Sequence, residues 1–215
     1  MVPYLWEQGV RRIDTLVLSH ADQDHVGGFP GLAAQMPIDR ILAGEPGEMA
    51  DPRAEPCLAG QGWTWDGVDF AVLYPFQAGL EGNDSSCVLR VATQGASLLV
   101  PGDLGQAPER QLARRGGLTT TLLVAGHHGS NTSSSREFLA AVTPAWVLYA
   151  SGFANRFGFP SARVRERVAT VGARELNTAE AGAIGFVLTA AGLEGPDLYR
   201  EAHPRLWSWR PQGER

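Results

Sequence analysis

Residues 19–28 read SHADQDHVGG, and this stretch holds four side chains that can bind a metal ion: His20, Asp22, Asp24 and His25. It follows an apolar segment, residues 13–19, whose pattern predicts a buried strand. A loop that leaves a strand can aim such side chains at one point, where two carboxylates repel each other unless a divalent cation lies between them. The alternative is a polar surface turn with an Asx motif. Imidazole and carboxylate donors packed this closely favour a metal site.

Two more segments end an apolar strand with polar side chains. Residues 98–103 read LLVPGD, so Asp103 can be a bridging metal ligand or the N-cap of a helix that begins near Gln106. Residues 126–130 read GHHGS. Adjacent histidines cannot easily share a metal ion from opposite faces of an extended chain, so one of His127 and His128 is expected to be a ligand and the other to support a ligand or contact substrate.

Hydroxyl side chains follow the histidine pair. Residues 130–135 read SNTSSS and lead into a helix predicted at residues 133–142, with Thr132 or Ser133 as its N-cap. A hydroxyl-rich loop at a helix N-terminus is suited to binding phosphate, so Ser130, Thr132 and Ser133 are candidate substrate ligands. The alternative is a helix start with more capping groups than it needs.

Hydrophobic periodicity predicts a chain of alternating strands and helices. Strands are expected at residues 13–19, 38–42, 63–74 (a hairpin turning at Asp66-Gly67), 86–93, 97–101, 121–125, 145–150 and 183–189. Helices are expected at residues 26–35, 106–115, 133–142 and 160–171. This order is typical of the α/β class, either as two packed sheets covered by helices or as a doubly wound sheet. We expect a single domain over residues 1–215, with a core at 1–196 and a C-terminal tail at 197–215.

Charge is divided unevenly along the 215 residues. The net charge is −5, with −9 over residues 1–105 and +4 over residues 106–215, and every basic residue is arginine. An acidic half suits a cation and a basic half suits a phosphate-bearing substrate, whereas plain variation of surface charge is the alternative. No apolar run approaches the roughly 18 residues that span a bilayer, and no signal-peptide pattern is present. The chain by itself is therefore expected in the cytoplasm unless it is a piece of a larger protein.

The two cysteines, Cys57 and Cys87, lie in no metal-binding spacing. Cys87 sits in an apolar strand pattern and is interpreted as a small buried hydrophobic residue. A Cys57–Cys87 disulfide is the alternative, and it would require an oxidising compartment.

The three donor segments together resemble the metallo-β-lactamase superfamily. Its motif H-x-H-x-D-H is matched by residues 20–25, with Asp22 in place of the second histidine. Residues 20–28, 101–104, 127–135 and 155–158 resemble more closely the C-terminal domain of ComEC-type competence proteins, which internalise DNA. This resemblance covers nearly the whole chain.

The resemblance implies an αββα sandwich of two mixed sheets flanked by helices. It also implies one or two divalent ions, Zn²⁺ or Mn²⁺, and a set of ligands: His20, Asp22, Asp24, His25, Asp103 and His127. Asp24, Asp103 and His128 are the expected catalytic residues, and Asn155 and Arg156 join the hydroxyl loop in substrate binding. The implied partners are DNA, single-stranded or duplex, and the remainder of a membrane-embedded competence protein, with no lipid insertion by this chain. The implied location is the periplasmic face of the inner membrane.

The chain departs from the family pattern at several positions. Asn83 stands where many superfamily members have a histidine, and Phe159 stands where the competence branch has one. Only Glu180 remains of two acidic residues that usually precede a Gly-Ala-Ile element, here residues 182–184. The chain also begins just before the strand that leads to His20, so the family's first strands are expected to be missing.

These observations predict a metal-dependent phosphodiesterase or DNA nuclease that serves DNA uptake. Two ions can stabilise both oxygens of a displacement at phosphorus and supply hydroxide at neutral pH. The arginines at positions 163, 165 and 167 could hold neighbouring phosphates, although they equally suit a solvated helix face. One competing hypothesis is a catalytically weak module that binds metal and DNA, which the loss of histidine at Phe159 favours. The other is a small-molecule metallo-hydrolase, which Asp22 and the hydroxyl loop disfavour.

Overall fold

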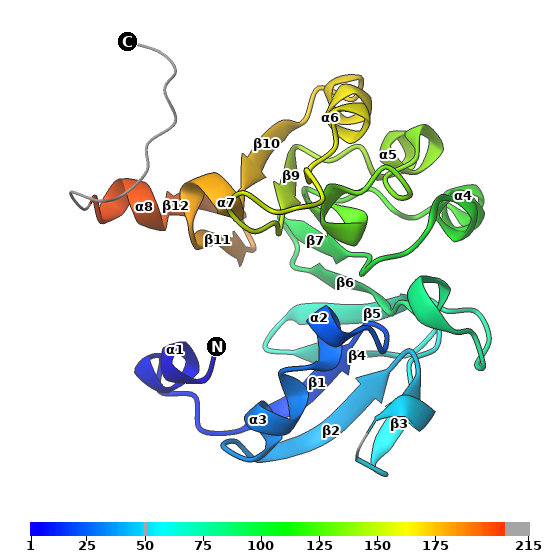
Figure 1. Ribbon diagram of the computed structural model, residues 1–215, viewed down its shortest axis with the longest axis vertical. Coiled ribbons are helices and arrows are strands. Elements are labelled where there is room, and N and C mark those ends of the chain that lie inside the picture. The colour runs from blue at the N-terminus through cyan, green and yellow to red at the C-terminus, as the bar shows by residue number, and fades with distance from the viewer. Residues whose placement is uncertain (50, 205–215) are drawn as a thin grey trace. The chain divides into compact units, whose positions relative to one another are not determined.

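The computed structural model describes residues 1–49 and 51–204 and divides into two compact units (Figure 1). The first unit comprises Met1–Gly62, Ala71–Leu89 and Pro101–Leu104. The second comprises Trp63–Phe70, Arg90–Val100 and the chain from Gly105 onward. The expected single domain over residues 1–215 stays a prediction, and most of its tail, residues 205–215, lies outside the described residues. None of the described helices is long and apolar enough to cross a membrane.

The first unit is built on a three-stranded parallel sheet of order β1-β2-β3. Its strands are β1 (Ile13–Leu18), β2 (Ile38–Ala43) and β3 (Ala54–Pro56), and its helices are α1 (Val2–Glu7), α2 (Gln23–Val26) and α3 (Phe29–Ala33). Short 3₁₀ turns occupy Pro46–Glu48 and Gly82–Ser85. Phe29 and Leu32 of α3 pack with Ile38 and Ile41 of β2 in one buried core. Burial of this apolar face is what fixes the helices against the sheet.

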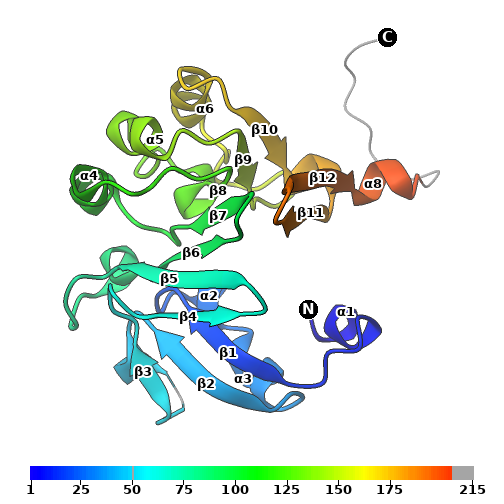
Figure 2. The same ribbon diagram turned by 180° about the vertical axis from the view of Figure 1, so that it is seen from behind.

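A seven-stranded sheet has the order β10-β9-β8-β7-β6-β5-β4, and its strands β7 to β10 lie in the second unit. Its strands are β4 (Gly62–Trp65), β5 (Val68–Tyr74), β6 (Val88–Ala92), β7 (Ser97–Val100), β8 (Leu122–Val124), β9 (Trp146–Tyr149) and β10 (Arg174–Asn177). The strands from β7 to β10 pair in parallel. Figures 1 and 2 show three helices along these parallel strands: α4 (Gln106–Arg115), α5 (Arg136–Val142) and α6 (Ala162–Ala169). The predicted α/β class is confirmed.

The chain after β10 continues with short elements that are partly new. They are α7 (Thr178–Ala181), β11 (Ile184–Thr189), β12 (Gly192–Leu198) and α8 (Tyr199–Ala202). β11 and β12 pair antiparallel in a separate two-stranded sheet. The strand predicted at residues 183–189 is therefore confirmed, whereas β3, β10 and β12 were not predicted.

The helix predicted at residues 26–35 is wrong, because the structure has two short helices there. α2 ends at Val26, and α3 begins at Phe29 with Pro30 in its first turn. Pro30 has no N–H to donate to the carbonyl of Val26, so it starts a new helix more readily than it continues an old one.

The helix predicted at residues 133–142 begins later than expected, at Arg136, with Ser135 as its N-cap. The reason is Glu109 of α4, which is completely buried. Its carboxylate accepts the backbone N–H groups of Ser134 and Ser135, at 2.6 Å and 2.7 Å. Burial raises the pKa of Glu109 to about 7, and these hydrogen bonds oppose the rise. Two N–H groups at the N-terminus of this helix are thus bonded to a carboxylate of the protein.

Cys87 is buried as predicted, and the structure joins it to Cys57 in the disulfide that the sequence offered as the alternative. Both residues are buried in the first unit. The N–H of Cys57 donates to the carbonyl of Ala43 at the end of β2, and the N–H of Cys87 donates to the carbonyl of Ser19 after β1. The disulfide therefore links a segment bonded to the end of β2 with a segment bonded to Ser19, the residue before His20.

Candidate metal centre

The candidate metal centre of the first unit forms where two parallel strands end. β1 and β2 pair in register from Ile13 with Ile38 to Leu18 with Ala43, so the residues after both strands meet at one edge of the sheet. The N–H of Gly44 donates to the carbonyl of Leu18 at 3.1 Å. This edge brings together the loop that starts at Ser19 and the loop that starts at Gly44.

Gly44 lets three backbone segments approach closely at this edge. A side chain there would place its Cβ atom 2.2 Å from both the Ser19 and the Ser85 carbonyl oxygens, which is far inside any contact that real atoms make. Backbone atoms cannot move aside as a flexible side chain can. The loop carrying His20 is therefore held at a distance that only glycine permits.

We expect Gly44→Ala to destabilise the chain by at least about 2 kcal/mol, because relieving these two contacts must separate the strand ends. Gly47→Ala is the matched control, since a Cβ at that position in the same loop meets no atom within 4 Å. Urea unfolding of both variants measures the effect. Equal midpoints for Gly44→Ala and the wild type would show that this close approach does not occur.

Ser19 orients both histidines of the SHADQDH stretch. Its Oγ lies 3.1 Å from Nδ1 of His20 and 2.9 Å from Nδ1 of His25. The two imidazole rings are 4.2 Å apart between centroids. The hydroxyl oxygen has two lone pairs and can accept Nδ1–H from both rings, and in that arrangement Nε2 of each ring keeps the lone pair that can bind a metal ion.

His20 is the residue whose surroundings most favour a metal ion. Its side chain is fully buried, and its Nε2 has no hydrogen-bond partner among the described residues. Burial, followed by the charge of His25, lowers the pKa of His20, so the ring is held in the neutral form that coordinates metals. A buried polar atom without a partner costs free energy, and a divalent ion would remove that cost.

Asp103 adds a buried carboxylate to the two histidines. It follows Gly102, whose φ is +60° and where an added Cβ would lie 2.9 Å from Cβ of Ser19 and 3.0 Å from the side chain of Ser86. The Asp103 N–H donates to Ser86 Oγ at 3.1 Å, and Oδ1 lies 3.2 Å from Nε2 of His25. Although burial lowers the pKa of His25, its hydrogen bond to Asp103 and the negative charge of that carboxylate raise it overall. A cation can take the place of the proton that these two groups share.

The structure thus brings three predicted ligands together, since one donor atom each from His20, His25 and Asp103 lie within 4.8 Å of one another. Two imidazoles and one carboxylate are a donor set that suits Zn²⁺ or Mn²⁺. The residues present therefore fit the metal that the sequence predicts.

Asp22 and Asp24 lie beside this trio on its solvent-exposed side. Their side chains are 59% and 65% exposed, and their Oδ2 atoms lie 3.4 Å from Nε2 of His20 and 3.8 Å from Nε2 of His25. Asp22 precedes α2 without capping it through its side chain, so the alternative of a simple Asx turn has no support from its hydrogen bonds. Their roles as ligands stay predictions.

Glu45 is a residue of this site that sequence reasoning missed. Its Oε1 accepts the N–H of Ala21 at 3.0 Å and the hydroxyl of Ser85 at 2.9 Å. Burial alone would raise the pKa of Glu45, but these hydrogen bonds outweigh it and lower the pKa. The carboxylate thereby fixes the residue that follows His20, and a sequence separation of 24 residues gave no signal of this contact.

The remaining predicted residues belong to the second unit. His127 and His128 follow β8 with φ of 50° and 55°, a left-handed backbone that non-glycine residues rarely adopt. Nδ1 of His128 lies 2.9 Å from the carbonyl oxygen of Ala150, to which it donates, so Nε2 carries the lone pair. Nδ1 of His127 lies 3.1 Å from Oγ1 of Thr132. These contacts hold the strained backbone in place, as is common at functional sites.

The hydroxyl loop is only partly open to solvent. Thr132 is exposed and its Oγ1 lies 3.0 Å from Oγ of Ser130, whereas Ser130 and Ser133 are buried. The side chain of Asn155 bonds to Gly152 and Phe159 of its own loop. Arg156 is exposed. The substrate-binding roles of these residues stay predictions, and Thr132 and Arg156 are the members that solvent reaches most freely.

Comparison with known proteins identifies the family. The model of the Metallo-beta-lactamase superfamily matches residues 2–152. The chain belongs to the metallo-β-lactamase superfamily. Its fold agrees, since CmlA, a diiron β-hydroxylase from Streptomyces venezuelae, superposes with a TM-score of 0.51 at 16% identity over 77% of this chain and 43% of CmlA. The predicted fold is confirmed.

The chain is also similar to proteins of bacterial competence, as its motifs indicated. Competence protein ComA of Neisseria gonorrhoeae is 42% identical over 98% of this chain and 30% of its own length. Recombination protein 2 of Haemophilus influenzae is 33% identical over 86% of this chain and 23% of its own length. The chain therefore spans less than a third of these relatives, and it corresponds to one part of a longer protein in each of them.

Proposed function

We propose that this chain is a metal-dependent phosphodiesterase that cuts DNA during its uptake. The observation that carries the proposal is the buried trio of His20, His25 and Asp103, in which the buried Nε2 of His20 makes no hydrogen bond by geometric criteria and lies 3.4 Å from Oδ2 of Asp22. The superfamily consists largely of metal-dependent hydrolases, and the relatives with competence and recombination in their names point to DNA as the substrate. A bound divalent ion would supply Lewis-acid stabilisation of phosphate charge and a water molecule of lowered pKa.

The chain's own residues would divide the remaining work. His20 and His25, aimed by Ser19, would hold the metal through Nε2, and Asp103 would neutralise its charge. Asp22 and Asp24, exposed beside the trio, would complete its coordination. From the sequence motif alone, we further assign His127 as a ligand and His128 as the group that transfers a proton. Thr132, which bonds both His127 and Ser130, would position a phosphate oxygen.

The disulfide supports a location outside the cytoplasm. Disulfides persist in oxidising compartments such as the periplasm and are rare in the cytosol. Cys57 and Cys87 are paired and buried. We therefore propose that the chain works on the periplasmic side of the membrane, joined to the remainder of a membrane-embedded competence protein, where incoming DNA reaches it first.

A plasmid-nicking assay with Mn²⁺ or Zn²⁺, repeated with EDTA, tests the proposal. Cutting that requires metal supports the nuclease. If the chain binds metal and DNA without cutting, the binding module takes its place. A chromogenic lactam that is hydrolysed while DNA stays intact would favour the small-molecule hydrolase.

His128→Ala is expected to lower DNA turnover by about 100-fold or more while leaving metal content unchanged, since this is the usual contribution of a general acid or base. The hydrogen bond from Nδ1 to Ala150 fixes the tautomer that leaves Nε2 available for the proton. Parallel measurement of metal content and nicking rate separates the two effects. Loss of metal in His128→Ala, with none in His127→Ala, would reverse the assignment within the pair.

A further inference from the structure

A stack of planar side chains stands on the loop between β9 and α6. The rings of Phe157 and Phe159 lie parallel within 18°, with centroids 5.4 Å apart. The guanidinium of Arg156 lies over the Phe157 ring, 4.8 Å from its centroid. At its inner end, the Phe159 ring meets the ring of His127 at 6.0 Å. The stack therefore extends from solvent to a histidine that the sequence motif predicts as a metal ligand.

The loop that carries the stack is held in place by Asn155. Its amide nitrogen donates to the carbonyl of Phe159 at 2.8 Å, and its amide oxygen accepts the N–H of the same residue at 2.9 Å. The amide nitrogen also lies 3.1 Å from the carbonyl of Gly152. Both backbone groups of Phe159 are thus fixed by one side chain. The stack is presented on a preorganised loop, which reduces the entropy that a ligand must overcome.

Folding gains little from the outer ring of the stack. Phe157 is 63% exposed, and nearby Phe153 is 57% exposed. Exposed phenylalanine on a fixed loop, with a guanidinium beside it, matches the way proteins bind unpaired bases: aromatic and guanidinium planes stack on the bases, and positive charge meets the phosphates. We propose that Arg156, Phe157 and Phe159 form a stacking platform for the bases of single-stranded DNA.

The platform deepens the proposed function, on which it rests for the identity of its ligand. A base would stack on the exposed Phe157 ring, and Arg156 would turn to the neighbouring phosphate. Stacking tolerates every base because each has a π face, so the platform would hold a strand without selecting its sequence. It would thereby deliver single-stranded DNA to the side of His127.

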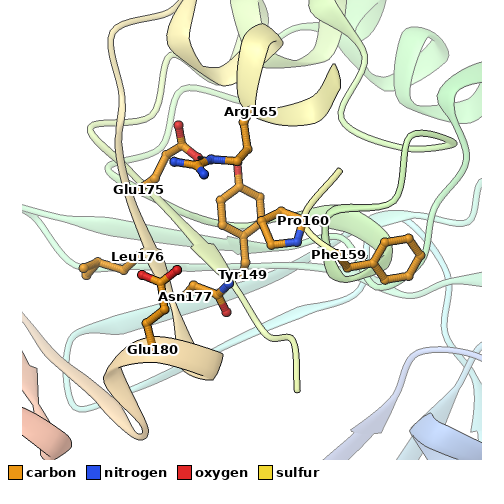
Figure 3. A pocket seen from close by; sticks show the side chains of 8 residues that line it. All are labelled: Tyr149, Phe159, Pro160, Arg165, Glu175, Leu176, Asn177 and Glu180. Atoms are coloured by element: carbon orange, nitrogen blue, oxygen red, sulfur yellow. Dashed lines mark hydrogen bonds and ion pairs between the residues drawn. The ribbon is translucent and has the colours of Figure 1, made fainter. Parts of the chain in front are cut away.

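A cavity beside the same loop does not suit the phosphates of such a strand. It has a volume of about 220 Å³, and its lining residues are Tyr149, Phe159, Pro160, Arg165, Glu175, Leu176, Asn177 and Glu180 (Figure 3). Arg165 pairs with Glu175 at 3.1 Å, which leaves a second carboxylate, that of Glu180, in the lining. Figure 3 shows the Phe159 ring turned away from Glu175 and Asn177. A DNA strand would therefore follow the rings and stay outside the cavity.

The test compares two labelled 12-mers that carry the same number of phosphates, one of thymidine and one of abasic sites, by fluorescence anisotropy with EDTA present. Wild type is expected to bind the thymidine strand more tightly. Phe157→Ala should weaken that binding by about 5- to 100-fold and leave abasic binding unchanged, since stacking is lost but charge is kept. Phe157→Trp should restore it. Tyr199→Ala is the matched control, because Tyr199 is another exposed aromatic residue of this unit, 48% accessible.

The outcomes separate this inference from the proposed function. If the chain cuts DNA with metal but Phe157→Ala binds both strands as the wild type does, the platform is disproved and the nuclease stands. If the platform binds as expected but no metal yields cutting, the nuclease fails and the platform stands. If Phe157→Ala instead loses binding to phosphatidylglycerol vesicles with oligonucleotide binding intact, the rings contact a membrane and the inference is overturned.

Discussion

Asp103→Ala is expected to lower the metal affinity of the chain by more than 100-fold and to abolish DNA cutting. Mutation of a residue that only supports a metal ligand typically lowers metal affinity by about 10- to 100-fold. Asp103 is itself the buried carboxylate of the trio, so its loss should have a larger effect. Without it, Nε2 of His25 loses the partner that lies 3.2 Å away, and the positive charge of the metal stays uncompensated in a buried site. Isothermal titration with Zn²⁺ and Mn²⁺ measures the loss.

Asp197→Ala provides the control for this variant, because Asp197 is an exposed carboxylate on β12. We expect Asp103→Ala to remain folded, because the hydrogen bond from the N–H of residue 103 to Ser86 Oγ belongs to the backbone and survives the substitution. Circular dichroism checks this. A folded Asp103→Ala chain that binds metal as tightly as the wild type would remove Asp103 from the ligand set.

Breaking the Cys57–Cys87 disulfide is expected to have the largest effect on stability. The bond closes a loop with a sequence separation of 30 residues, for which the loss of chain entropy in the unfolded state corresponds to about 3–4 kcal/mol. For a chain of this size, that lowers Tm by roughly 10 °C. Because Cys87 also donates its N–H to Ser19, the reduced protein should bind metal more weakly.

Thermal unfolding with and without a reducing agent measures this effect. The paired substitution of both cysteines by serine should reproduce the reduced Tm, and the reductant should leave that variant unchanged. As a direct check, the chain is unfolded without any reducing agent and treated with a thiol reagent. Reaction with two equivalents of reagent would show that no disulfide exists.

The sequence predicted best what depends on neighbours along the chain. His20, Asp22, Asp24 and His25 lie within one turn after a strand, so their convergence follows from local geometry alone. The bounds of α4 at residues 106–115 and the hairpin turn at Asp66-Gly67, with φ of 48° and 79°, are also local properties and were predicted correctly.

The features that were missed depend on residues far apart in sequence. Glu109 delays the start of α5 by accepting N–H groups 25 and 26 residues away, which no capping rule for residues 133–135 contains. Glu45 reaches the backbone of Ala21 in the same way. The pairing of Cys57 with Cys87, which the sequence offered only as an alternative, likewise depends on tertiary approach, because cysteine spacing alone does not fix a connectivity.

The central claim is that the trio of His20, His25 and Asp103 holds a divalent ion, and metal content of the purified chain tests it most directly. Mass spectrometry should find at least about one equivalent of Zn²⁺ or Mn²⁺ per folded wild-type chain, and the same measurement on His20→Ala and Asp103→Ala should find nearly none. EDTA should remove the metal, and added Zn²⁺ or Mn²⁺ should restore it. A folded wild-type chain that holds no divalent metal, even after both ions are supplied in excess, would contradict the account.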